Sequence, residues 1–197
     1  RYDKAFPVPF AEYMPNRAFF HSLAPELVDM VQLEYSFGER PAVLDIETPA
    51  GNVRAGIAIC FDIVFDDHAV ALMNGVTGSS GAASDAQVIL AQTNNADFGH
   101  TDQSAQQLQI AKLRAIETGR ALVNVSTVGT SAIVLGDGEE LQRLEPYTSA
   151  AMVAEVPLMT GLTPALRFGS LYAAAWVTLA ALGLWLSWYA SRRAKQR

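Results

Sequence analysis

Six short runs of apolar residues are spaced along the first 160 positions of the chain. Most contain valine or isoleucine and are bounded by glycine, aspartate or asparagine, which is typical of strands buried on both faces. The runs are residues 42–46, 53–60, 88–92, 121–126, 131–135 and 152–156. This pattern predicts six strands.

Two stretches between these runs have the spacing of helices. Residues 66–74 open with two aspartates, and residues 104–118 place apolar side chains on one face before the helix stop at Gly119. Residues 1–35 contain four prolines and many aromatic residues, so we expect a long loop with at most short helices there. Strands that alternate with helices indicate an α/β layered domain.

Residues 171–190 contain no charged side chain. Twenty helical residues at about 1.5 Å each span about 30 Å, the thickness of a bilayer's hydrocarbon core. Aromatic residues lie near both ends, where their rings favour the membrane interface. The sequence therefore predicts a transmembrane helix. The alternative is a buried helix within a larger soluble core.

The charge distribution adds an orientation to this prediction. Ten of the 14 basic residues and all 20 acidic residues lie in residues 1–170, which therefore carry a net charge of −10. No basic surface remains for general nucleic-acid binding. The other four basic residues lie in residues 191–197, so the positive-inside rule predicts a cytoplasmic tail and an outer location for residues 1–170.

The single cysteine, Cys60, excludes a disulfide within the chain and a site built from several thiolates. It ends a predicted strand and precedes an acidic turn, a place where α/β folds put a nucleophile. The alternative is a buried thiol that acts as a small apolar side chain. Position alone leaves both interpretations open.

A nucleophilic thiol needs a cation or a base beside it. His21, His68 and His100 lie in loop-like or surface-like contexts, which predicts exposed side chains rather than bases. Lys112 lies beside glutamines on its helix and is expected to be solvated. Lys4 precedes an apolar segment stiffened by prolines, yet its local features alone indicate a surface lysine.

Five motifs follow one another along the chain. They are Tyr2-Asp3-Lys4 with residues 7–15 (PVPFAEYMP), then 56–62 (GIAICFD), 93–99 (TNNADFG), 106–120 (QQLQIAKLRAIETGR) and 160–164 (TGLTP). In this order, and followed by an apolar terminal segment, the set resembles the apolipoprotein N-acyltransferases, which are membrane-embedded members of the nitrilase superfamily. The resemblance covers nearly the whole chain.

The resemblance implies a fold and a division of the chain. Residues 1–170 would form the C-terminal part of a nitrilase-like catalytic domain, an α/β fold of the α-β-β-α sandwich type. Residues 171–190 would form one transmembrane helix, and residues 191–197 a basic cytoplasmic tail.

The resemblance also implies site residues. In the family's Glu–Lys–Cys triad, Cys60 would be the nucleophile and Lys4 the cationic member, with Glu12 as an additional active-site glutamate. The backbone N–H of Phe61 would be an oxyanion donor. Asp62 stands where the family has a glutamate, one methylene longer.

Three further residues are assigned by the same motifs. Asp97 replaces a tryptophan and is expected to alter a surface that faces the substrate. Arg114 and Glu117, spaced i, i+3 on one helix face, are expected to form a structural ion pair near the site.

By the same resemblance, the triad glutamate and several transmembrane helices should precede Lys4. No motif before Lys4 matches that glutamate, and the chain opens at Arg1 without a signal peptide. We therefore expect the C-terminal part of a longer enzyme, inactive by itself.

The implied reaction is acyl transfer in lipoprotein maturation. Cys60 would take a fatty acyl chain from a membrane phospholipid as a thioester and pass it to the N-terminal amine of a diacylglyceryl-cysteine on an apolipoprotein. The resemblance implies a monomer in the bacterial inner membrane, with the catalytic part periplasmic, and requires no cofactor. The apolar pairs Phe19-Phe20 and Leu72-Met73 would then be either membrane-facing elements or core.

Two other functions remain open at this stage. One is a nitrilase-type amidohydrolase that acts on a small amide, and the other is a membrane-anchored domain without catalysis. The terminal apolar segment favours the acyltransferase over a soluble amidase, and the joint presence of Cys60, Lys4 and Glu12 favours an enzyme.

Overall fold

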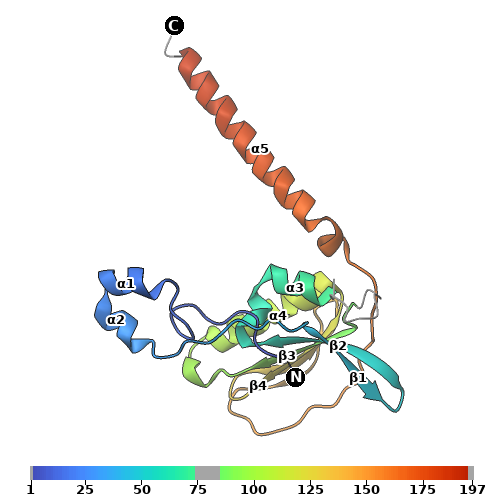
Figure 1. The fold of residues 1–197 in the computed structure, drawn as a ribbon. Helices are drawn as coiled ribbons and strands as arrows, with labels where there is room; N and C mark the ends of the chain where they lie inside the picture. Colours follow the sequence, from blue (N-terminus) through green and yellow to red (C-terminus); the bar gives the residue numbers. More distant parts are fainter. Residues whose placement is uncertain (1, 74–84, 195–197) are drawn as a thin grey trace. The chain divides into compact units, whose positions relative to one another are not determined.

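The structure, a computed structural model, describes residues 2–73 and 85–194. It divides into two compact units, Arg1–Gly161 and Leu162–Arg197. The first unit is an α/β layered domain built on a single six-stranded sheet, and the second consists mainly of one long helix (Figure 1).

The strands of the sheet lie in the order in which they occur in the sequence. The central three run parallel, and the outer three are antiparallel to their neighbours. They are β1 (Val43–Thr48), β2 (Gly51–Ile59), β3 (Val88–Thr93), β4 (Ala121–Ser126), β5 (Ser131–Val134) and β6 (Glu140–Leu144). The parallel strands contribute most of the buried apolar side chains of the sheet, among them Ala58, Ile89 and Leu122.

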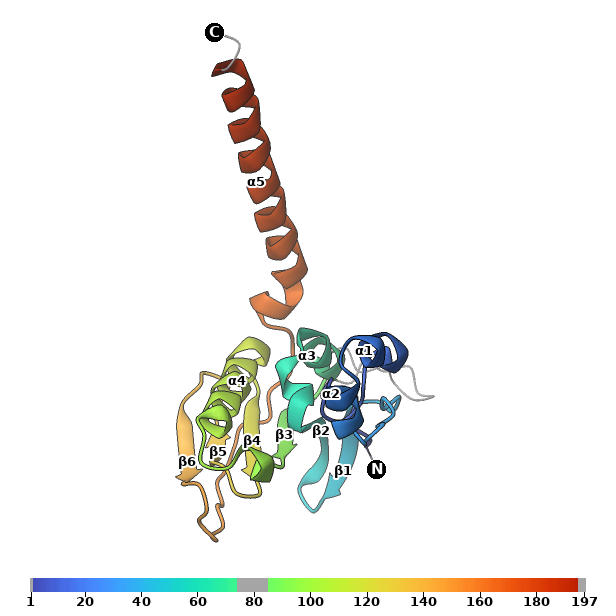
Figure 2. The same cartoon turned by 90° about the vertical axis from the view of Figure 1, so that its left-hand side faces the viewer.

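Two helices, α3 (Asp66–Met73) and α4 (Gln103–Thr118), cover one face of the sheet (Figure 2). The buried side of α4 carries Leu108, Ala111 and Ala115. On the same face Gly56 has no room for a side chain, because a Cβ atom would lie 2.9 Å from the Leu72 side chain. Close packing of α3 on β2 therefore depends on this glycine.

The opposite face of the sheet is built from the alternate residues of the same strands. Ala55, Ile57, Val88 and Ala121 form a buried cluster there. Val156 packs against this cluster from outside the sheet.

Arg120 connects three segments of the first unit. Its buried guanidinium donates to the carbonyl oxygens of Ala86 (2.6 Å), Thr118 (3.1 Å) and Gly161 (2.6 Å). Burial lowers the pKa of Arg120, which the charge of Asp85 opposes. The start of β3, the end of α4 and the end of the unit are thus held by one side chain.

Five of the six predicted strands are present, and the sixth is wrong. Residues 152–156 form no strand, because they pair with no neighbour in the sheet. The sheet instead ends with β6, which alternates half-buried and exposed residues and pairs with β5. Charged residues in β6 hid it from a search for apolar runs. The predicted strand 53–60 ends one residue early, at Ile59.

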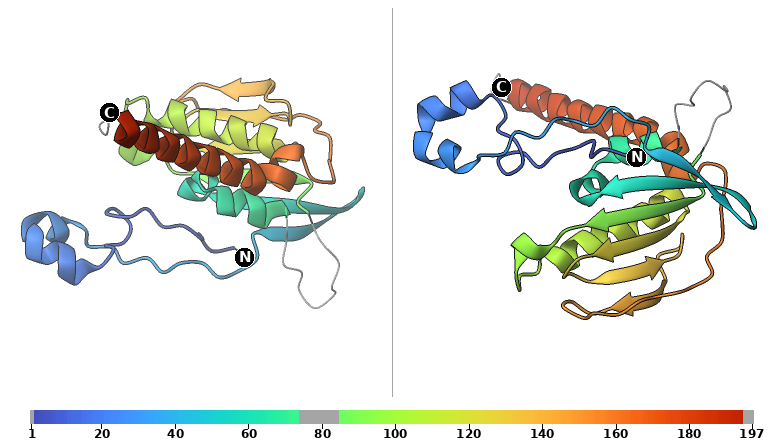
Figure 3. Two further views of the ribbon diagram at one scale, coloured as in Figure 1. Left: turned by 90° about the horizontal axis from the view of Figure 1, so that it is seen from above. Right: turned by 60° about the horizontal axis from the view of Figure 1, so that its bottom comes forward.

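Residues 1–35 contain two short helices, α1 (Arg17–Leu23) and α2 (Pro25–Met30), which project away from the sheet as a pair (Figure 3). Leu72 and Met73 are core residues, whereas Phe19 is half exposed on α1. The predicted end of the helix at residue 74 lies outside the described residues.

The second unit is dominated by α5 (Pro164–Ala194), a 31-residue helix. Within Pro164–Arg193 an 18-residue window has a mean hydropathy of 1.5, and by length and composition the helix could cross a membrane. Near its end the Arg192 and Arg193 guanidinium groups lie 4.0 and 4.7 Å from the ring centres of Trp188 and Tyr189. Such cation–π pairs suit a membrane interface. Residues 195–197 lie outside the described part of the chain.

Candidate active site

Cys60 occupies a turn between strand and helix. β2 ends at Ile59, and Cys60 begins the short 3-10 helix η1 (Cys60–Val64). Its φ of +53° is left-handed, a conformation that is costly for a residue with a Cβ atom and that clusters at functional sites. The side chain is half-buried. A strained, partly accessible thiol at the end of a central strand is in a position to act as a nucleophile.

Asp62, two residues further on, is fully buried and accepts three hydrogen bonds. The donors are the Tyr2 hydroxyl (3.2 Å), the Phe6 backbone N–H (2.8 Å) and the Ile59 backbone N–H (3.0 Å). One carboxylate thereby fixes residues 2 and 6 against the turn that begins with Cys60. Lys4 lies between these two anchor points.

The Tyr2 hydroxyl remains a donor in this arrangement. Burial, the negative charge of Asp62 and their hydrogen bond raise the pKa of Tyr2 well above its usual range. The phenol therefore stays protonated at physiological pH and keeps its bond to the carboxylate.

Lys4 and Glu12 form an ion pair with 2.6 Å between Nζ and Oε2. Their side chains are only 12% and 24% exposed. The same Glu12 oxygen accepts the Val8 N–H at 2.7 Å, so the carboxylate is fixed from two sides. On the other side of the segment, Gly38 donates its N–H to the Lys4 carbonyl at 2.7 Å.

Gln107 contacts Cys60 from α4. Its Nε2 atom lies 3.8 Å from the Cys60 Sγ atom, and its Oε1 atom lies 3.0 Å from the Thr93 hydroxyl. Gln107 is not among the residues predicted from the sequence, because a glutamine on an amphipathic helix gives no signal of what its amide contacts. Its position within the 106–120 motif was the only signal available.

Arg114 supports the far end of η1. It donates to the carbonyls of Ile63 (3.0 Å) and Val64 (2.7 Å) and forms ion pairs with Glu117 and Asp66. Burial opposes the charge, but the hydrogen bonds to the two carboxylates leave the pKa of Arg114 above its ordinary value. The Arg114–Glu117 pair is thus an ion pair beside η1, the turn that begins with Cys60.

The remaining assigned residues lie at the periphery of these contacts. Phe61 is half-buried, and its ring packs edge-to-face on Phe65 with centroids 5.2 Å apart. Asp97 is exposed on the single turn η2 (Ala96–Phe98). The roles predicted for the Phe61 N–H and for Asp97 stay predictions.

Two expectations about isolated residues were wrong. His68 is 2% exposed rather than at the surface, and its Nε2 atom lies 2.9 Å from the Ile57 carbonyl oxygen. Burial lowers the pKa of His68, against the charge of Asp62. Lys112 is half-buried and pairs with Glu140 at 2.9 Å, because β6 lies beside α4 where solvent was expected.

His21 and His100 are exposed, as expected. The His21 Nε2 atom lies 3.3 Å from the Asp29 Oδ1 atom, and the His100 ring packs on the Tyr147 ring. Within residues 2–73 and 85–194, no group of three or more histidine, cysteine or acidic side chains is placed to hold a metal ion.

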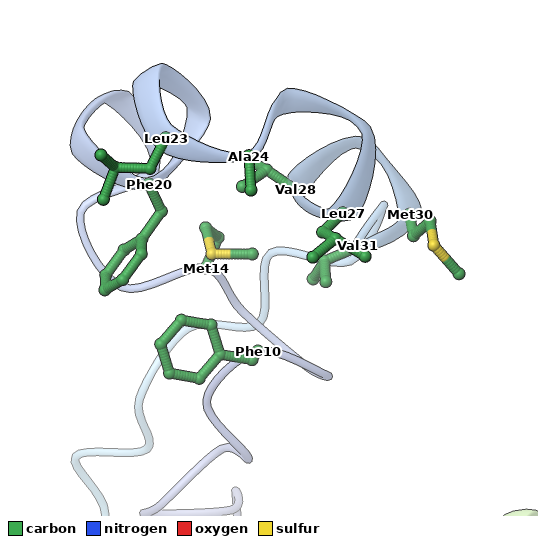
Figure 4. Close-up of a pocket in the computed structure, with 9 residues that line it drawn as sticks. All are labelled: Phe10, Met14, Phe20, Leu23, Ala24, Leu27, Val28, Met30 and Val31. Atoms are coloured by element: carbon green, nitrogen blue, oxygen red, sulfur yellow. The ribbon is translucent and has the colours of Figure 1, made fainter.

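An apolar pocket of about 410 Å³ opens next to the loop that carries Glu12. Figure 4 shows side chains from this loop and from both short helices pointing into one space. The pocket is lined by Phe10, Met14, Phe20, Leu23, Ala24, Leu27, Val28, Met30 and Val31.

Residues 1–161 match the carbon-nitrogen hydrolase family, and the chain belongs to this family. It is similar to curated apolipoprotein N-acyltransferases. The identity is 35% over 175 residues with that of Mycolicibacterium smegmatis (86% of this chain, 26% of the relative). It is 33% over 185 residues with that of Ralstonia nicotianae (92% and 33%), and 28% over 193 residues with that of Vibrio parahaemolyticus (98% and 35%).

The chain thus spans about a quarter to a third of the length of these curated relatives. Among solved structures, an amidase from Nesterenkonia sp. is similar, with a TM-score of 0.46 and 20% identity over 74% of this chain and 45% of that chain.

Proposed function

We propose that this chain carries the nucleophile of an apolipoprotein N-acyltransferase. The observation that carries the proposal is the Asp62 carboxylate, which fixes the segment bearing Lys4 against the turn that begins with Cys60. The similarity to curated enzymes of that name supports the choice of reaction.

In the first step the Cys60 Sγ atom, as a thiolate, attacks the ester carbonyl carbon of a membrane phospholipid. A C–S bond forms and the carbonyl oxygen becomes an oxyanion, which the Lys4 ammonium and the Phe61 N–H stabilise. The bond to the glycerol oxygen then breaks. The thiol proton, first taken up by a base, is delivered to that oxygen, and a lysophospholipid leaves.

In the second step the α-amine of a diacylglyceryl-cysteine attacks the thioester carbonyl carbon. A C–N bond forms, the C–S bond breaks, and the amine proton returns through the base to Cys60. The resemblance assigns the base to a glutamate that precedes Lys4 in the complete enzyme. Residues 1–197 alone are accordingly proposed to be inactive.

The chain's own residues have distinct parts in this scheme. Glu12 holds the Lys4 ammonium in place, and Asp62 holds the backbone on both sides of it. Arg114 and Glu117 support the end of the nucleophile turn. Asp97, exposed on its turn, faces the substrates.

We also propose a bacterial inner-membrane enzyme whose residues 171–190 cross the bilayer. Residues 191–197 are then cytoplasmic, and the acidic residues 1–170 are periplasmic, where the phospholipid and the apolipoprotein are available. The apolar pocket beside Glu12 has the lining that an acyl chain requires. The enzyme is proposed to act as a monomer.

The test uses the complete enzyme in detergent micelles with a phospholipid that carries a radiolabelled acyl chain. The wild type should acquire label that neutral hydroxylamine releases, as expected of a thioester, and Cys60→Ala should acquire none. Undiminished label on Cys60→Ala would overturn the assignment.

The carbon-nitrogen hydrolase match keeps a second function in view, hydrolysis of a small amide by the same thiol. Ammonia release from short aliphatic amides, without acyl transfer to a diacylglyceryl-cysteine peptide, would favour it.

A further inference from the structure

Gln107 reaches the nucleophile across 47 positions of the sequence. Its side chain belongs to α4, is 9% exposed, and places an amide group 3.8 Å from the Cys60 Sγ atom. In the scheme proposed above, no role is given to this buried amide. A polar group buried beside a reactive sulfur affects which protonation state of that sulfur is favoured.

The amide is held from its other end by a buried polar network. The Thr93 hydroxyl lies 3.0 Å from Gln107 Oε1 and 2.7 Å from Asn95 Oδ1. Asn95 in turn donates from Nδ2 to the Ser104 hydroxyl at 2.8 Å. All four side chains are buried, so this network is shielded from competing water.

The network accommodates either orientation of the amide. With Nε2 toward the sulfur, an N–H donates to the thiolate and Oε1 accepts the single Thr93 proton. The Asn95 amide then turns as well, so that its Nδ2 donates to the Thr93 oxygen and its Oδ1 accepts from the Ser104 hydroxyl. With the amide turned by half a rotation, Oε1 accepts the S–H of the thiol, while Nε2 donates to the Thr93 oxygen, whose own proton goes to Asn95. Both protonation states of Cys60 thus have a hydrogen-bond partner.

We propose that Gln107 is a positioning residue for Cys60. Its amide fixes the orientation of the Sγ atom and donates an N–H to the thiolate. This inference rests on the proposed function, in which Cys60 is the nucleophile. Hydrogen bonds to a charged group are about twice as strong as neutral ones, so the amide favours the reactive state.

The experiment measures the rate at which iodoacetamide alkylates Cys60 in the complete enzyme, from pH 6 to pH 10, with Cys60→Ala as background. Alkylation follows the thiolate and needs no lipid and no general base. Gln107→Leu keeps the volume and removes both polar atoms, whereas Gln107→Glu keeps the shape and replaces the donor with a negative charge. Gln106→Leu, at an exposed position of the same helix, is the matched control.

The midpoint of the pH profile should move up by about one pH unit in Gln107→Leu, and the rate at pH 7 should fall about tenfold. Gln107→Glu should move it further, and Gln106→Leu should match the wild type. Unchanged midpoints in both Gln107 variants would overturn the inference. If Gln107→Leu fails to fold, Gln107→Glu alone decides, since it retains an oxygen toward Thr93.

The two proposals fail in different ways. Label that persists on Cys60→Ala overturns the proposal that Cys60 carries the acyl chain. That result leaves the alkylation profile of the Gln107 variants unaffected. If the alkylation profile is the same in the Gln107 variants as in the wild type, and Cys60→Ala loses the label, only the role of Gln107 is overturned.

Discussion

The hydroxyl of Tyr2 donates a hydrogen bond to the Asp62 carboxylate across 60 positions of the chain. The same carboxylate accepts the Phe6 N–H, so the residues on both sides of Lys4 are anchored to one buried group. The position of the segment that carries Lys4 therefore depends on a side chain that is not itself part of the proposed chemistry.

Asp62→Asn should break this anchor. An asparagine has only one acceptor atom, so at least one of the three donors would face an NH₂ group. We expect a loss of about 1–3 kcal/mol in the free energy of unfolding and a loss of acyl-thioester formation. Asp67→Asn, at an exposed position of α3, is the control. Wild-type thioester levels in Asp62→Asn would contradict the anchoring role.

Lys4→Ala should sharply reduce acyl-thioester formation while leaving the fold in place. Glu12 keeps its bond from the Val8 N–H when the ammonium is gone, so the loop retains a contact. Removing an oxyanion donor lowers turnover by about 100-fold or more. Thioester formation and the melting temperature of the same sample separate the two effects. Normal turnover in a folded Lys4→Ala enzyme would refute the assignment.

Gly38→Ala should displace Lys4 without altering any proposed catalytic group. A Cβ atom at this position would lie 2.7 Å from the Lys4 carbonyl oxygen and would also collide with the Asp3 carbonyl. Both obstacles are backbone, so the segment must move, and misplacement by about 1 Å costs up to about 100-fold in rate. Gly169→Ala, where a Cβ atom meets nothing within 4 Å, should leave acyl transfer unchanged. Equal activity of the two variants would argue against a strict position for Lys4.

Protonation of His68 should destabilise the first unit in mild acid. Its pKa is lowered by burial and by the charge of Arg114, against the charge of Asp62 and the hydrogen bond to Ile57. The unfolded chain therefore binds a proton at a higher pH than the folded one, and stability is complete above about pH 6.5 and falls as the pH drops below it. Melting temperatures between pH 7.5 and 5 should show this fall in the wild type and a smaller one in His68→Gln. Identical slopes would show that another group is responsible.

The central strands could be predicted because each is a run of apolar residues flanked by turn formers. β6 could not be predicted in this way, because Glu140 and Arg143 make its sequence resemble a loop. It forms a strand by pairing with β5. Residues 152–156 show the opposite case, because their apolar positions suit a strand but no strand pairs with them. Only the side chain of Val156 packs against the core.

The residues of the candidate site could also be predicted only where a local motif contains them. Cys60 and Lys4 could be proposed from motifs, because their local sequences carry the resemblance. The roles proposed for Asp62 and Gln107 rest on contacts with residues 47 to 60 positions away, which no local pattern encodes. The local context of His68 indicates a surface position, whereas the histidine lies on the side of α3 that faces the sheet.

The three contacts of Arg120 determine when the first unit can complete its folding during synthesis. Two of the carbonyls that satisfy its guanidinium, Ala86 and Thr118, precede it in the chain, whereas Gly161 follows 41 residues later. At about 5–20 residues per second, a ribosome needs about 2–8 s to make that stretch. Until then the buried charge lacks one of its three acceptors. The first unit can therefore reach its final stability only after Gly161 has been made, just before the first residue of α5, Pro164.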